Sequence, residues 1–157
     1  MDLCPKITTA TDITLITLQK CPSNLSFIAD VFEKIAALGV DVDMISLAPT
    51  QGAYTSVSFT IADSDLDKIL SFTSDLRLQS QISAVVSSGN CKISVYDDGM
   101  KNTPGVAAEV FNIASSVHTD IRLITTSEVD ISLLVTAADF QETLKALETK
   151  LNHKSTT

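Results

Sequence analysis

The chain has 157 residues, 45% of them hydrophobic, and its 19 acidic and 11 basic side chains give a net charge of −8. This length allows one domain or two small ones that share an interface, and no apolar run reaches the roughly 18 residues that cross a bilayer. Because the charge disfavours nucleic acid and the N-terminus lacks a signal-peptide pattern, we expect a soluble cytoplasmic protein that binds neither nucleic acid nor membrane.

The first predicted elements are strands. Residues 6–9 form a short strand-like piece, and residues 13–18 are rich in β-branched side chains. Apolar residues at helical spacing then predict a helix from Phe27 to Leu38, with Gly39 in the position of its C-cap. Patterns of the same kinds predict the remaining elements of this half: strands at 40–44, 54–61 and 82–86, and a helix that Asp63 caps.

The second half of the chain shows the same order of elements. A strand at 91–96 is followed by a helix at about 104–117, which begins with a proline that suits a first turn. Strands at 121–125 and 129–135 come next, and a final helix carries apolar residues from Phe140 to Leu151. Residues 152–157 form a polar tail.

An internal repeat explains this order. Val31-Phe32 matches Val110-Phe111, and Met44-Ile45-Ser46 matches Leu123-Ile124-Thr125 at the same offset. Two copies of one unit of about seventy residues therefore account for the sequence better than chance does.

The repeat predicts an α+β fold of two ferredoxin-like βαββαβ units, each a four-stranded antiparallel sheet with two helices on one face. The second copy lacks its last strand, so we expect the N-terminal strand at 6–10 to complete its sheet and interlock the two units. The predicted units are residues 12–88, and residues 89–151 with that strand. Small units with open sheet edges favour a homodimer.

Catalytic and metal-binding patterns are absent from the sequence. The three cysteines form no Cys-x-x-Cys pair and have no histidine at ligand spacing, so we expect free thiols and no metal. Five glycines form neither a phosphate-binding loop nor a nucleophile elbow, and we expect no cofactor. The pair Asp97-Asp98, at the end of a predicted strand, is typical of a solvated turn.

Two loops lead into helix N-termini and are candidate binding sites. They are residues 20–26 (KCPSNLS) and 99–105 (GMKNTPG). The unpaired amides and dipole of a helix N-terminus attract an anion, and the small residues Ser26 and Gly105 let a ligand approach the backbone. Ordinary capping by Ser23, Asn24 or Thr103 explains the same residues equally well.

The second of these loops belongs to a recognisable string. MKNTPGVAAEVF, followed by DIRLITTSEVDISLLV, closely resembles the second ACT unit at the C-terminus of aspartate kinases. NLSFIADVFEKIAALGVDVDMIS resembles the first ACT unit of the same enzymes, and ITTATD resembles the short strand that there joins the second sheet. The resemblance covers about residues 6 to 151, nearly the whole sequence.

The resemblance implies a regulatory function and no enzyme activity of its own. Paired ACT units of that family bind an end-product amino acid, lysine or threonine, and turn the kinase down. The implied partners are therefore this free amino acid, a second copy of the chain, and the catalytic domain or subunit of an aspartate kinase. The implied effector site lies where the first unit of one chain meets the second unit of the other.

The effector-site residues are carried over from the family motifs. In the first unit they are Ser23, Asn24, Leu25, Ser26, Asp43, Met44 and Ile45, and in the second unit Ala107, Asp120, Ile121, Thr125, Thr126, Ser127 and Glu128. The resemblance implies that helix N-terminal amides and hydroxyls hold the ligand carboxylate, and that Asp43 or strand carbonyls hold its ammonium group. We expect the hydroxyls of Thr125 to Ser127 to serve a polar pocket or a subunit contact, and Glu128 to fix the turn or a cationic partner. The alternative is that threonine and serine merely suit a strand end.

The first unit departs from the family pattern. It has CPSNLSF where many members have an Asp-x-Pro-Gly turn, and Leu47 stands where threonine-binding members commonly place glutamine. NLS followed by an aromatic residue is nearer the lysine-responsive type. The alternative function is therefore a structural dimerisation module with a decayed pocket.

Overall fold

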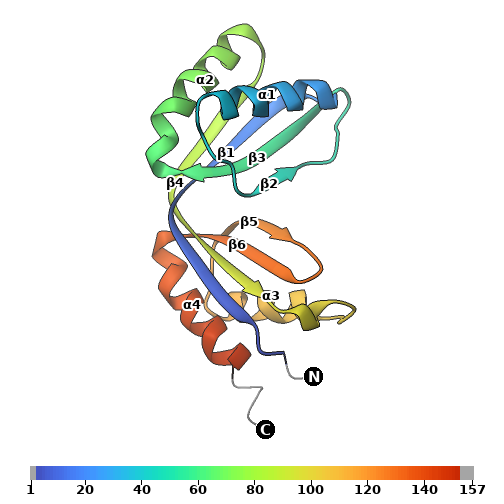
Figure 1. Cartoon of the computed structure of the whole chain (residues 1–157), viewed down its shortest axis with the longest axis vertical. Helices are drawn as coiled ribbons and strands as arrows, with labels where there is room; N and C mark the ends of the chain where they lie inside the picture. The colour runs from blue at the N-terminus through green and yellow to red at the C-terminus, as the bar shows by residue number, and fades with distance from the viewer. Residues whose placement is uncertain (1–2, 153–157) are drawn as a thin grey trace. The chain divides into compact units, whose positions relative to one another are not determined.

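A computed structural model describes residues 3–152 of the chain (Figure 1). They form two compact units, which we call the first unit (residues 12–89) and the second unit (residues up to 11, with those from 90 onward). No helix among the described residues is long and apolar enough to cross a membrane. The elements are β1 (Lys6–Pro22), α1 (Leu25–Ala37), β2 (Ile45–Leu47), β3 (Tyr54–Ala62), η1 (Asp63–Asp65), α2 (Leu66–Gln79), β4 (Ser83–Tyr96), η2 (Asp98–Met100), α3 (Val106–Ser116), β5 (Ile121–Thr126), β6 (Asp130–Thr136) and α4 (Ala137–Asn152).

The first unit is a sheet in the order β2-β3-β1-β4, with α1 and α2 on one face (Figure 1). β1 and β3 are antiparallel, from Ile13 opposite Ala62 to Pro22 opposite Tyr54. One core cluster joins the inward face of the strands to both helices; its fully buried members include Ile16, Leu18, Ile35, Phe59 and Ile69.

The second unit repeats this arrangement in the order β1-β4-β6-β5, with α3 and α4. β4 and β6 are antiparallel, from Asn90 opposite Thr136 to Tyr96 opposite Asp130. The first part of β1 takes the outer position next to β4, where Ile7 packs against the core of this unit. The predicted α+β class is therefore confirmed, including an N-terminal strand that completes the second sheet.

Some predicted element bounds are wrong. Residues 40–44 are not a strand, although Val40 and Met44 are buried, and β2 begins only at Ile45. The buried and exposed side chains alternate here as in a strand, but the Met44 N–H donates to the Thr60 hydroxyl (2.9 Å) instead of to a main-chain carbonyl.

Two further bounds differ because of backbone geometry. α3 begins at Val106 and not at Pro104, because Gly105 (φ +96°) takes a left-handed conformation that ends the loop. The strands predicted at 82–86 and 91–96 are one continuous β4, in which Gly89 (φ +70°) is the left-handed residue.

The three cysteines are free thiols, as predicted, and differ in their surroundings. Cys4 is exposed, whereas Cys21 and Cys91 are buried. Burial also raises the pKa of the Cys21 thiol, which lowers its thiolate fraction at neutral pH. We expect iodoacetamide at pH 8 to modify Cys4 first in the folded protein and all three cysteines in urea, as measured by intact mass. Equal rates at Cys4 and Cys21 in the folded protein would contradict this structure.

Candidate functional site

The loop at 97–105 and the β5–β6 turn lie at the same end of the second sheet. β4 ends at Tyr96, which pairs with Asp130 at the start of β6. One residue later, the Asp97 N–H donates to the Val129 carbonyl (3.0 Å). The register of the sheet therefore brings together two stretches that are separated in sequence and that both carry predicted site residues.

The loop at 97–105 is shaped by its own hydrogen bonds. The Met100 N–H donates to the Asp97 carbonyl (3.0 Å) and the Thr103 N–H to the Met100 carbonyl (3.0 Å). The Thr103 hydroxyl donates to the Gly99 carbonyl (2.7 Å). Asn102 has φ +60°. These bonds hold the loop in one course from β4 to α3.

The N-terminus of α3 has no side-chain cap. Gly105 is its N-cap residue, and the Glu109 N–H donates to the Gly105 carbonyl (3.0 Å). Since the Thr103 hydroxyl bonds within the loop, the predicted capping by Thr103 is not found. The exposed Ala107 lies in this first turn. The first-turn amides therefore have no side-chain acceptor, which suits an incoming anion.

The turn after β5 carries the predicted hydroxyls and carboxylate. The Ser127 N–H donates to the Asp130 carbonyl (2.9 Å), and the Val129 N–H donates to the Ser127 hydroxyl (3.3 Å). Thr125 is half-buried, while Thr126, Ser127 and Glu128 are exposed. The turn is thus closed by backbone bonds, and its outer side chains face solvent.

An ion pair links the turn to the loop. The Glu128 carboxylate lies 3.0 Å from the Lys101 ammonium group. Both side chains are more than half exposed, so the pair contributes less than about 1 kcal/mol to stability. The pair places the Glu128 carboxylate beside the loop at 97–105.

Asp120 and Ile121 lie at the opposite end of β5. The Asp120 N–H donates to the Asp139 carboxylate (2.8 Å), and the Asp120 carboxylate pairs with Arg122 (3.1 Å). At about 3.3 Å per residue, β5 separates Ile121 from the turn by about 15 Å. The second-unit residues of the predicted site therefore fall into two groups, and the turn belongs with the loop.

In the first unit, the loop before α1 is used to cap that helix. The Asn24 carboxamide oxygen accepts from the Phe27 N–H (2.8 Å) and from the Ser26 hydroxyl (2.9 Å). The Ser23 N–H donates to the Ala53 carbonyl (3.0 Å). Leu25 is 77% exposed. The capping alternative therefore holds for Asn24, in contrast to α3.

The other first-unit residues lie at the start of the outer strand, β2, and just before it. The Met44 side chain is 3% exposed and belongs to the buried core, so a ligand cannot contact it. The Asp43 N–H donates to the Thr60 carbonyl (3.1 Å). Ile45 is 52% exposed on β2, the edge strand. Asp43 and Ile45 are thus the accessible members of this group.

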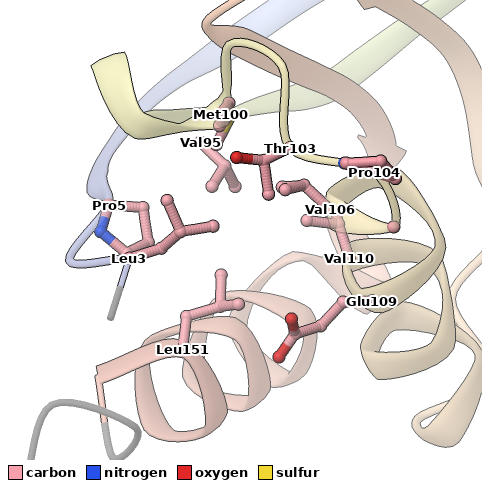
Figure 2. A pocket seen from close by; sticks show the side chains of 11 residues that line it. Leu3, Pro5, Val95, Met100, Thr103, Pro104, Val106, Glu109, Val110 and Leu151 are labelled. Atoms are coloured by element: carbon pink, nitrogen blue, oxygen red, sulfur yellow. The ribbon is translucent and has the colours of Figure 1, made fainter. Parts of the chain in front are cut away.

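Two pockets add residues that the sequence patterns did not indicate. In the second unit, a pocket of about 250 Å³ lies between residues 3–5, the loop at 97–105 and the helices α3 and α4. Figure 2 shows Leu3 and Pro5 on one side of this pocket and Leu151 below it. In the first unit, a pocket of about 380 Å³ is lined by Lys20, Gln51 and neighbouring polar and apolar residues. Their walls come from distant parts of the sequence, which local patterns do not connect. No cluster among the described residues could hold a metal ion.

Comparison with known proteins supports the resemblance. Residues 93–151 match the ACT domain family. An aspartokinase from Geobacillus stearothermophilus is 33% identical over 125 residues, which cover 78% of this chain and 30% of that protein. The chain spans about a third of the length of the curated relatives that it matches.

Solved structures share the fold. The ligand-free regulatory subunit of aspartate kinase from Thermus thermophilus has a TM-score of 0.83 at 24% identity, with 100% of each chain covered. Aspartokinase III from Escherichia coli, in complex with lysine and aspartate, has a TM-score of 0.69 at 22% identity over 94% of this chain and 34% of that one. At sequence identities of 24% and 22%, these structures establish a shared fold.

Proposed function

The chain is a tandem ACT protein of the aspartate kinase regulatory type, and we propose that it binds lysine or threonine and thereby controls an aspartate kinase. The kinase catalytic domain or subunit is the proposed partner, because the similar Thermus thermophilus protein is a regulatory subunit. The amino acid is the proposed signal that turns that kinase down.

One observation carries this proposal. The uncapped first turn of α3 and the hydroxyl-bearing turn at 125–128 lie at the same end of the second sheet, and the Lys101–Glu128 ion pair joins this turn to the loop that leads into α3. The ligand carboxylate goes to the amides of α3, which need an acceptor. The hydroxyls of Thr126 and Ser127 supply the polar wall.

A second copy of the chain supplies the other half of the proposed site. There, Asp43 or the carbonyls of β2 bind the ligand ammonium group, since an ammonium group only donates hydrogen bonds. The edge strands also carry exposed apolar side chains: Ile45 (52%), Leu47 (55%) and Ile124 (40%). Such an edge favours pairing with another chain.

The proposed homodimer makes a prediction for β2. Ile45→Lys places a charge on the exposed edge strand, and lysine there opposes strand pairing. We expect sedimentation velocity to show a dimer for the parent and mainly monomer for Ile45→Lys. Leu78→Lys is the matched control, because Leu78 is 84% exposed and lies on α2 instead of on an edge strand. A dimer that survives Ile45→Lys unchanged argues against pairing through β2.

Lysine is the first effector to test. NLSF resembles the lysine-responsive type, and the similar aspartokinase III was solved with lysine. A thermal-shift screen of the amino acids is the experiment. At a concentration of one hundred times its dissociation constant, the effector should stabilise the protein by about 2.7 kcal/mol.

Variants test the site in the same screen. Ser127→Ala removes an exposed hydroxyl and should reduce the shift without unfolding the protein. Ser115→Ala, an exposed hydroxyl near the other end of α3, should leave the shift unchanged. If both variants show the same thermal shift with the amino acid as the parent protein, the turn at 125–128 is not part of the site.

The competing function is a structural dimerisation module. It is favoured by the first unit, where Asn24 and Ser26 bond to each other and Met44 is buried. Such a module dimerises but shows no thermal shift with lysine, threonine or any other amino acid.

A further inference from the structure

One carboxylate in the second unit holds two separate backbone segments. The Cys4 N–H donates to Asp97 Oδ2 (2.9 Å), and the Gly99 N–H donates to Asp97 Oδ1 (2.7 Å). Hydrogen bonds to a charged acceptor are stronger than those between neutral groups. Asp97 therefore ties the N-terminal segment, which we define as Leu3–Pro5, to the loop at 97–105.

A close side-chain contact reinforces this tie. A Cβ atom placed on Gly99 would lie 2.9 Å from Leu3 Cδ2, so Leu3 packs directly on the loop where the chain has no side chain. Leu3 and Pro5 also line one side of the pocket, and Met100 and Thr103 of the loop lie above it (Figure 2). The N-terminal segment thus covers the inner side of the loop.

The same loop reaches the candidate site on its other side. The Asp97 N–H donates to the Val129 carbonyl, beside the turn at 125–128. Lys101 pairs with Glu128, and the loop leads directly into the uncapped α3. Asp97 thus contacts the N-terminal segment with its side chain and, with its backbone N–H, the residue that follows the turn.

We propose that Asp97 is a positioning residue for the effector site: it makes docking of the N-terminal segment a condition for the binding conformation of the loop at 97–105. This inference rests on the proposed function of that loop. The contacts that attach β1 to the second sheet and the contacts that hold the amino acid then share one element. By linkage, the effector must stabilise the docked segment as much as the docked segment favours the effector.

Asp97→Asn tests the tie with little change of shape. An amide keeps one acceptor oxygen and places an NH₂ group against the second N–H, so one of the two hydrogen bonds is lost. Asp98→Asn is the matched control, since it makes the same charge change one residue later, where the carboxylate accepts from the Tyr96 hydroxyl. Without any ligand, we expect hydrogen exchange at residues 3–8 and 98–103 to quicken in Asp97→Asn and to stay at the parent rate in Asp98→Asn.

Calorimetric titration with lysine and with threonine tests the positioning role. We expect the affinity to fall about tenfold in Asp97→Asn and to be unchanged in Asp98→Asn. In the parent, saturating effector should slow exchange at residues 3–8, which a purely structural role of Asp97 does not require. Leu3→Ala, which weakens the same docking without touching the carboxylate, should lower the affinity in the same direction and serves if Asp97→Asn does not fold.

The two readouts separate this inference from the proposed function. If the parent binds neither amino acid, the proposed function fails, while the exchange rates still decide whether Asp97 holds the N-terminal segment. If the parent binds and Asp97→Asn and Leu3→Ala keep its affinity, the positioning role is overturned. If hydrogen exchange at residues 3–8 is unchanged in Asp97→Asn, Asp97 does not hold the N-terminal segment against the loop.

Discussion

Phe59→Ala is expected to lower the free energy of unfolding by about 3–5 kcal/mol. Phe59 lies on β3 in the middle of the first-unit sheet and is 0% exposed. Its ring packs edge-on against Phe32, with the ring centroids 5.5 Å apart. Truncation removes this contact and leaves a cavity that the surrounding β-strands and helices fill only in part.

Urea unfolding followed by far-UV circular dichroism measures this change. The control is Leu78→Ala, because Leu78 is 84% exposed on α2 and its truncation should stay within about 0.5 kcal/mol of the parent. A loss of less than about 1 kcal/mol for Phe59→Ala would mean that β3 does not occupy the centre of this core.

Ile7→Asp is expected to destabilise the second unit by about 2–4 kcal/mol, since it puts a charge against an apolar core. Ile7 lies in the first part of β1 and packs on the core that contains Leu133 and Phe140. The neighbouring Thr8 is exposed, because successive side chains of a strand point to opposite faces. Thr8→Asp is therefore the matched control and should have little effect.

Hydrogen exchange by mass spectrometry locates the damage of Ile7→Asp. We expect β6 in the second unit to lose more protection than β3 in the first unit. Equal loss in both β-strands, or no loss in β6, would contradict the finding that the N-terminal strand completes the second sheet.

The repeat made the fold predictable, because both copies keep their buried positions in phase. Ile16 and Ile93 are both 0% exposed at matching places in the two units. The alternation of buried and exposed residues gave a wrong prediction at residues 40–44, which do not form a strand. Alternation reports which side chains are buried, and the hydrogen bond from Met44 to the Thr60 side chain has no local sequence signal.

The candidate site was predictable only in part. The loop at 99–105 was a candidate because it leads into a helix, and the turn at 125–128 was a candidate because of its distinctive string. The loop and the turn come together through contacts between residues that are distant in the sequence: Lys101 with Glu128, and Asp97 with Val129. Asp97 also contacts Cys4. The sequence indicated a solvated turn at Asp97-Asp98. No local pattern there distinguishes Asp97, which accepts hydrogen bonds from two N–H groups, from its neighbour Asp98.

Isothermal titration of the parent protein with L-lysine and L-threonine tests the central claim most directly. The proposed function predicts saturable binding of one of these two amino acids, reduced in Ser127→Ala and retained in Ser115→Ala. A folded dimer that binds neither of them, and no other amino acid in the thermal-shift screen, would contradict it and leave the structural dimerisation module.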